Sequence, residues 1–209
     1  MRTTPALKVT VLGASGRAGS QIVKELARRG HQVTGVARNP EKIPVGENIT
    51  AVAGDVQHPD TVRPALAGAD AVVSAIMFTD TKPDQLIDLV KSAHVSRYLV
   101  VGGAGSLEVA PSVKLIDTPA FPEAYKTEAR AGSLFLEHLK AENDLDWTFL
   151  SPSALFDGNQ RTGTFRLGSH QLLSDADGNS AISFPDYAIA MVDEIETPSH
   201  SRTRFTVGY

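Results

Sequence analysis

The stretch Gly13-Ala-Ser-Gly16-Arg-Ala-Gly19 decides the fold, because it joins a β-branched run at residues 8–12 to an amphipathic segment at residues 19–29. Glycines at this spacing, between a strand and a helix, are typical of a dinucleotide-binding turn. Gly13 would allow the sharp turn, Gly16 would leave room for a pyrophosphate, and Gly19 would let the helix pack closely on the strand. The alternative is a tight turn between strand and helix that binds no ligand.

The other residues of this turn are predicted to hold phosphate. The free N–H groups at the start of a helix and its positive dipole end attract anions. Ser15, Arg17 and Ala18 occupy these positions. We therefore expect them, with the three glycines, to contact the diphosphate of a dinucleotide.

Strand and helix signals alternate through the first 150 residues, which predicts βαβ units and a parallel sheet. The fold class is therefore α/β, with a doubly wound, mostly parallel Rossmann sheet. Residues 151–183 are polar and glycine-rich, and we expect them to form a small C-terminal lobe on the substrate side. The whole chain, residues 1–209, is predicted to be a single NAD(P)-binding domain. Strands are expected at residues 8–12, 31–37, 49–53, 70–76, 97–101, 146–150, 162–167 and 204–207, and helices at 19–29, 60–66, 82–92, 123–143 and 183–196.

Composition excludes several classes of protein. The 209 residues are 42% hydrophobic and 21% charged, with 20 Lys and Arg against 24 Asp and Glu, for a net charge of −4. This charge argues against a nucleic-acid partner, which would need a basic face. The chain has no cysteine, so it has no disulfides and no thiolate chemistry. We expect a cytoplasmic protein that does not bind membranes, since no apolar run reaches the ~18 residues of a membrane span. The composition leaves a monomer and a homodimer equally open.

Residues that follow the predicted strands should meet at one edge of the sheet, where doubly wound folds bind their ligands. Asp55 could accept a hydrogen bond from an adenine amino group, or it could cap the next helix. The residues placed at the cofactor by topology alone are Asp55, Val56, Ser74, Ala75, Ile76, Gly102, Gly103, Ser151, Pro152 and Ser153.

The second strand ends in Arg38 and Asn39, whereas sites for NAD usually place an acid near this point to hold the ribose 2′-hydroxyl. Arg38 and Arg17 could converge on a 2′-phosphate instead. Such a charge-assisted bond contributes about 1.5–3 kcal/mol. The sequence therefore predicts NADP(H) as the cofactor, with NAD(H) as the alternative dinucleotide. Either arginine could also be a solvated surface residue.

The predicted acceptor side begins at residue 102. Residues 102–122 are rich in glycine and proline and predict a long loop, which in a compact domain is often functional. Ser106 and Tyr125 are candidate catalytic residues that could hydrogen-bond a substrate carbonyl. Tyr125 also begins a stripe at helical spacing, so a packed core tyrosine is equally expected. The stripe comprises Tyr125, Ala129, Gly132, Leu136 and Leu139, and the candidate pocket walls are Phe78, Phe121 and Phe156.

The chain resembles the atypical short-chain dehydrogenase/reductases, and within them the NmrA-like group of NAD(P)H-flavin reductases, relatives of the flavin/biliverdin-IXβ reductases. The resemblance covers nearly the whole chain and implies a Rossmann fold, an NAD(P)H cofactor and a planar small-molecule acceptor such as a flavin. The matching stretches are Gly13-Ala-Ser-Gly-Arg-Ala-Gly19, Gly54-Asp-Val56, Gly102-Gly-Ala-Gly-Ser-Leu107, Asp117-Thr-Pro-Ala-Phe-Pro122 with Tyr125, Asp146-Trp-Thr148 with Ser151-Pro152, Phe165-Arg-Leu-Gly168 and Arg204-Phe-Thr-Val207.

The chain departs from typical short-chain dehydrogenases, in which a Tyr is followed four residues later by a Lys. Tyr98, Tyr125 and Tyr187 are followed at that distance by Gly102, Ala129 and Met191. An alcohol–carbonyl dehydrogenase mechanism is therefore disfavoured. Hydride transfer to flavin N5 needs no obligatory enzymic proton donor, because water can protonate the reduced ring.

Three functions remain open. The first is an NADPH-dependent flavin reductase, the second a non-enzymatic NADP(H)-binding redox sensor, and the third a quinone or enone reductase. The six histidines lack the short spacing of a metal site, so no metal is expected.

Overall fold

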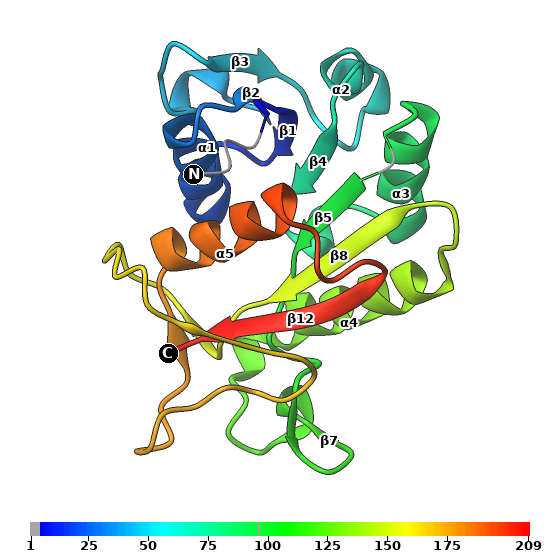
Figure 1. The fold of residues 1–209 in the computed structure, drawn as a ribbon. Helices are drawn as coiled ribbons and strands as arrows, with labels where there is room; N and C mark the ends of the chain where they lie inside the picture. Colours follow the sequence, from blue (N-terminus) through cyan, green and yellow to red (C-terminus); the bar gives the residue numbers. More distant parts are fainter. Residues whose placement is uncertain (1–4, 96) are drawn as a thin grey trace.

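The computed structural model describes residues 5–95 and 97–209. They form three layers, a central sheet with a layer of helices on each face (Figure 1). The sheet has eight strands in the order β10-β12-β8-β5-β4-β1-β2-β3. Every neighbouring pair is parallel except β10 and β12. This confirms the predicted doubly wound, Rossmann-like α/β fold. The strands of this sheet are β1 (Lys8–Leu12), β2 (Gln32–Ala37), β3 (Ile49–Ala53), β4 (Ala71–Ser74), β5 (Arg97–Val101), β8 (Asp146–Ser151), β10 (Arg166–Gly168) and β12 (Thr203–Gly208).

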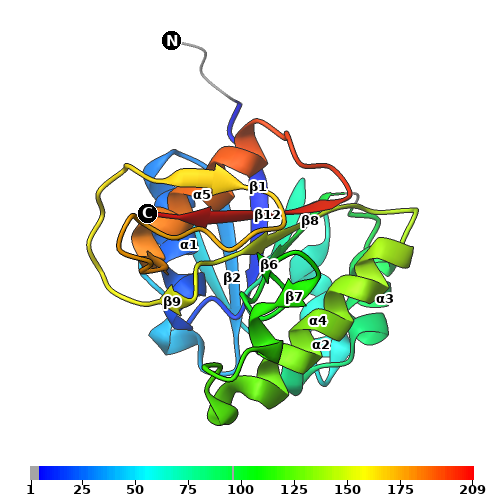
Figure 2. The same ribbon diagram turned by 90° about the horizontal axis from the view of Figure 1, so that it is seen from below.

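Helices cover both faces of the sheet (Figure 2). One face packs on α1 (Arg17–Arg28) and α5 (Phe184–Glu196), and the other on α2 (Pro59–Leu66), α3 (Pro83–Ser92) and α4 (Lys126–Ala141). None of the helices among the described residues is long and apolar enough to span a bilayer. Short 3₁₀ turns occur at Pro40–Lys42, Phe78–Asp80, Leu115–Asp117 and Glu123–Tyr125.

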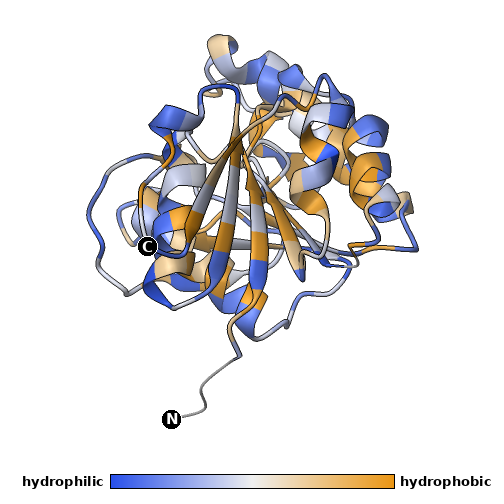
Figure 3. Cartoon of the chain, turned by 90° about the horizontal axis from the view of Figure 1, so that it is seen from above, coloured by the Kyte–Doolittle hydropathy of each residue, from blue (hydrophilic) through white to orange (hydrophobic). Residues whose placement is uncertain are grey.

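The central strands are apolar on both sides, as expected for a sheet covered twice (Figure 3). In β1, Val11 faces the core beneath α1 and α5, whereas Leu12 faces the core beneath α2, α3 and α4. Trp147 of β8 belongs to the second core, is 3% exposed, and its indole Nε1 has no hydrogen-bond partner among the described residues.

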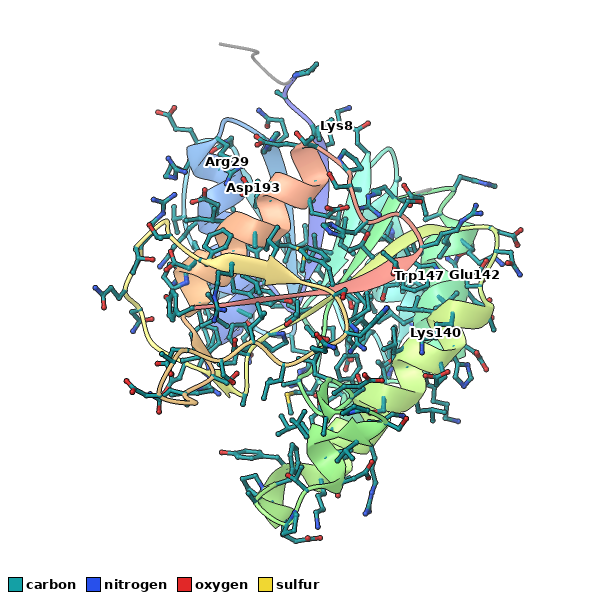
Figure 4. All side chains as sticks on the ribbon, turned by 60° about the horizontal axis from the view of Figure 1, so that its bottom comes forward. Lys8, Arg29, Lys140, Glu142, Trp147 and Asp193 are labelled. Atoms are coloured by element: carbon teal, nitrogen blue, oxygen red, sulfur yellow. The ribbon has the colours of Figure 1, made fainter. Side chains whose placement is uncertain are left out.

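Ion pairs join α1 to α5. Arg29 contacts Asp193 at 2.7 Å, Glu196 at 2.6 Å and Glu25 at 2.9 Å, and Figure 4 shows Arg29 and Asp193 together between the two helices. Glu25 is buried and also accepts from Arg28 at 2.6 Å. Burial alone would raise the pKa of Glu25, but the hydrogen bonds and charges of Arg28 and Arg29 outweigh it and lower the pKa to about 2.

The region from 102 to 125 is more ordered than the sequence predicts. It contains a hairpin, β6 (Glu108–Ala110) and β7 (Val113–Lys114), whose turn holds Ser112 at φ 62°. The prediction of a helix from residue 123 is wrong at its start, because a 3₁₀ turn precedes α4. Because of that turn, the inward-facing stripe of α4 begins at Ala129 and does not include Tyr125. Tyr125 is 65% exposed and is not a core residue.

The segment 151–183 is tied to the sheet rather than separate from it. β10 extends the central sheet, while β9 (Leu155–Phe156) and β11 (Ala181–Ile182) pair with each other. The predicted strand at 162–167 is wrong at its start, because Thr162 and Gly163 donate backbone hydrogen bonds to the buried Asp186 carboxylate. Ser183 caps the last helix, since its Oγ accepts from the Asp186 N–H at 3.2 Å.

Candidate functional site

The glycine turn has the geometry that each glycine was predicted to supply. Gly13 lies at φ +79°, and a Cβ there would meet the Ala75 carbonyl oxygen at 2.3 Å. A Cβ on Gly19 would meet the Gly13 carbonyl oxygen at 2.2 Å, so the helix could not pack so closely with a larger residue. A Cβ on Gly16 would have one near neighbour, the Gly13 carbonyl oxygen at 3.3 Å, and Gly16 lines a surface pocket.

Helix α1 begins at this turn, and no side chain of the described residues caps its first N–H groups. Gly16, the N-cap, provides no side chain, and the first turn contains no acid. The N–H groups of Arg17, Ala18 and Gly19 have no carbonyl acceptor within the helix, because they lie in its first turn. Together with the positive dipole end, they could hold a diphosphate. The turn is fixed by hydrogen bonds from Gly13 and Ala14 to the Val36 carbonyl of β2.

A surface pocket lies between this turn and the ends of β2, β3 and β4. It brings together eight of the residues predicted to bind cofactor: Gly13, Ser15, Gly16, Arg38, Asp55, Val56, Ala75 and Ile76. Sequence reasoning missed other residues that line it, among them Gln57, Met77 and Asp80. No strand ends at these three, so the sequence contained no signal for them. Asp55 accepts from the Gln57 N–H at 3.0 Å and does not cap α2.

The two predicted arginines do not converge in this structure. Arg38 lies in the pocket, 3.9 Å from Asp80. Arg17 instead reaches Asp157 at 3.7 Å, and its guanidinium lies 5.1 Å from the centre of the Phe184 ring. Arg38 therefore lines the pocket, whereas Arg17 lies over the neighbouring aromatic ring. Asn39 is exposed and begins the 3₁₀ turn Pro40–Lys42, outside the pocket lining.

The remaining residues that were placed by topology lie outside the pocket lining. Ser74 and Ser153 are buried, and Ser153 Oγ donates to the Val207 carbonyl at 3.0 Å. Gly102 is required by packing, since a Cβ there would lie 2.3 Å from the Phe149 ring. The others are Gly103, which faces open space, Pro152, which is buried, and Ser151, whose buried Oγ has no partner among the described residues.

Tyr125 is the accessible tyrosine of the four. Burial raises the pKa of Tyr98 and Tyr187, and the Tyr187 hydroxyl donates to the Leu150 carbonyl at 2.7 Å. The Tyr209 hydroxyl donates to Asp186 at 2.7 Å. Tyr125 has a neighbouring Lys126, but this ammonium pairs with Glu123. The structure therefore shows no Tyr–Lys pair of the type used by alcohol dehydrogenases among the described residues.

Ser106 belongs to a polar cluster that joins three distant segments. Arg204 of β12 donates to Ser106 Oγ at 3.3 Å and to His170 Nδ1 at 3.4 Å. Arg204 is 7% exposed, and burial lowers the pKa of its guanidinium, opposed by the charges of Glu108 and Glu137. Sequence reasoning missed Arg204, because it lies within a predicted buried strand.

The three predicted aromatic walls have different surroundings. Phe78 is a core residue that packs on Phe135 and Phe149, with ring centroids 5.3 and 6.0 Å away. Phe156 is half-buried and packs against Phe184 at 4.5 Å. Phe121 is half-buried in the segment before α4.

Among residues 5–95 and 97–209 no cluster of three metal-binding side chains occurs.

Comparison with known proteins agrees with this geometry. A family profile described as NAD(P)H-binding matches residues 13–198. Protein YwnB of Bacillus subtilis is 40% identical, with 96% of this chain and 98% of the relative aligned. A crystal structure from Bacteroides thetaiotaomicron, named as a candidate epimerase, has a TM-score of 0.92 and 43% identity over 98% of this chain and 97% of that one. A candidate NADH-flavin reductase from Streptococcus pneumoniae has a TM-score of 0.83 and 36% identity over 97% and 99%.

The fold and the glycine turn define a Rossmann-like, NAD(P)H-binding protein with the architecture of an oxidoreductase. The chain belongs to the NAD(P)H-binding family, whose profile matches most of its length. A more distant structure from Veillonella parvula, 19% identical with a TM-score of 0.76 over 97% of this chain and 94% of that one, shares the fold and was determined with NADP.

Proposed function

We propose that this protein is an NADPH-dependent oxidoreductase that transfers hydride to a flavin or another planar acceptor. The observation that supports this most directly is the pocket at the glycine turn, which presents Arg38 at the end of β2 where sites for NAD usually present an acid. The cofactor preference and the acceptor are both part of the proposal.

The residues around the pocket would hold the diphosphate and the adenosine half of the cofactor. The uncapped N–H groups of α1 would bind the diphosphate, and Arg38 would pair with the 2′-phosphate. Asp55 could accept a hydrogen bond from the adenine amino group. When bound, the reduced nicotinamide would supply a hydride, that is, one proton together with two electrons.

The acceptor side supports a reaction that needs little proton chemistry. Tyr125 is exposed, and the ammonium of its neighbour Lys126 pairs with Glu123. Ser106 is half-buried and receives a hydrogen bond from Arg204, so its own hydroxyl hydrogen is available to an acceptor carbonyl. In a flavin the hydride would go to N5, and a proton from water would complete the reduction. The protein would then mainly bring the two rings together and exclude water.

The experiment is to follow NADPH oxidation at 340 nm with FMN, FAD, riboflavin or a quinone as the acceptor. We expect turnover above the non-enzymatic background with at least one flavin. Turnover with quinones alone would reassign the acceptor. Tight NADPH binding without turnover on any acceptor would contradict the proposed reaction and favour a redox sensor, which binds the dinucleotide without reducing a substrate.

A further inference from the structure

We propose that Asp80 sets the discrimination between NADPH and NADH, by holding Arg38 in competition with the 2′-phosphate. This inference rests on the proposed function, because it concerns the same pocket. Asp80 follows β4, whereas Arg38 follows β2, so the two side chains approach from different walls of the pocket. Their ion pair, at 3.9 Å, joins those walls.

The main chain at Asp80 is fixed, although its side chain is partly exposed. Glu128 of α4 accepts hydrogen bonds from the N–H groups of Phe78 and Thr79 at 2.6 and 3.0 Å, and from the Thr79 hydroxyl at 2.9 Å. The Asp80 carbonyl accepts from Gln57 Nε2 at 3.2 Å. The Asp80 N–H donates to the Met77 carbonyl at 3.0 Å. These hydrogen bonds fix the main chain of Asp80, so its side chain projects from a defined position beside Arg38.

This arrangement makes a 2′-phosphate and Asp80 rivals for one guanidinium. Arg38 is 68% exposed and Asp80 44% exposed at their side chains, so water screens their attraction and a phosphate can displace the carboxylate. A phosphate paired with Arg38 would also lie near the negative charge of Asp80. NADH lacks the 2′-phosphate and would leave the Arg38–Asp80 pair in place. Asp80 would therefore weaken NADPH binding and leave NADH binding unchanged.

The test compares wild type with Asp80→Asn by calorimetric titration with NADP⁺ and NAD⁺, the oxidised forms that give no turnover. Asn keeps the size of the side chain and removes its charge. We expect the Kd for NADP⁺ to fall about two- to fivefold, as for other exposed charge pairs, with no change for NAD⁺. In an Arg38→Gln background the effect of Asp80→Asn on NADP⁺ should shrink, because the shared guanidinium is gone.

Asp60→Asn is the matched control, since Asp60 also makes an exposed pair at 3.9 Å, with Arg63, outside the pocket lining. It should leave the ratio of the two Kd values unchanged. The inference is overturned if Asp80→Asn leaves that ratio unchanged, shifts both dinucleotides equally, or shifts the ratio no more than Asp60→Asn does. Binding of neither dinucleotide by wild type would instead overturn the proposed function, and this inference with it.

Discussion

The candidate cofactor pocket takes its shape from the main chain, whereas the candidate acceptor side takes its shape from side chains that are distant in sequence. At the glycine turn, the decisive distances join an imagined Cβ to backbone carbonyl oxygens, 2.3 Å at Gly13 and 2.2 Å at Gly19. At the acceptor side, Arg204 reaches Ser106 across 98 residues of chain and His170 across 34. A main-chain site leaves a motif in the sequence, and a side-chain cluster of this kind does not.

The largest expected effect comes from filling the open position in the turn. Gly16→Val should lose about 3–6 kcal/mol of NADPH binding, because its side chain would occupy the space above the α1 N-terminus where two or more charge-assisted bonds would form. Its cost in stability should be about 1 kcal/mol, the penalty of an apolar N-cap. Calorimetric titration and thermal unfolding measure the two effects.

Gly19→Ala should mainly lower stability, whereas Gly16→Val should mainly lower NADPH affinity. Its Cβ would collide with the Gly13 carbonyl, so we expect a loss of about 2–4 kcal/mol in the free energy of unfolding. If Gly16→Val lost stability and kept full NADPH affinity, the turn would have no role in binding.

The next effect tests the ion pairs between α1 and α5. The glycine turn leads directly into α1. The pKa of Glu25 is lowered from 4.5 to about 2, which corresponds to about 3 kcal/mol of stability at neutral pH. Because the folded-state pKa is the lower one, this contribution is present above pH 4.5 and is lost as the pH falls toward 2. Glu25→Gln should therefore unfold about 3 kcal/mol more easily in urea at pH 7 and match wild type near pH 2.

Glu41→Gln provides the comparison for that measurement, since Glu41 is exposed in the 3₁₀ turn Pro40–Lys42. It should change the free energy of unfolding by no more than about 0.5 kcal/mol. An equal loss of unfolding free energy in both variants would show that the ion pairs of Glu25 stabilise the protein no more than an exposed carboxylate does.

A smaller effect tests the link between the two regions. Glu128 lies in the first turn of α4, three residues after Tyr125, and anchors the loop that carries Met77 and Asp80 into the pocket. Glu128→Gln should weaken both dinucleotides by about 1–2 kcal/mol, because an amide cannot accept all three hydrogen bonds as well as a carboxylate. Glu123→Gln, one turn earlier and exposed, should leave both affinities unchanged, as titration would show.

The smallest effect concerns the acceptor itself. Ser106→Ala should lower kcat/KM for the acceptor about three- to tenfold, the value of one neutral hydrogen bond, with no change in NADP⁺ affinity. Ser169→Ala, an exposed serine on the neighbouring segment, serves as its control in the same steady-state assay. A change in NADP⁺ affinity in Ser106→Ala would place Ser106 at the cofactor instead.

The sequence predicted the strands of the parallel sheet and the glycine turn, because short, mostly apolar β-branched runs and a glycine triplet depend on local chain geometry. It did not predict β6, β7, β9 or β11, which have only two or three residues and leave no periodic signal. Tyr125 was placed by helical spacing on an inward stripe, but a 3₁₀ turn has about three residues per turn and shifts the phase before Lys126. Arg17 was expected at the 2′-phosphate, and no local pattern could reveal Asp157 as its partner.

The isolation of the indole of Trp147 has a practical consequence. It is the sole tryptophan of the chain and lies in the apolar core, and no described group receives its N–H. An indole shielded from solvent should emit at shorter wavelengths than an exposed one. A red shift on denaturation would then report the opening of the layer beneath α4 without any added dye, while a dinucleotide bound across the sheet should leave the emission wavelength in place.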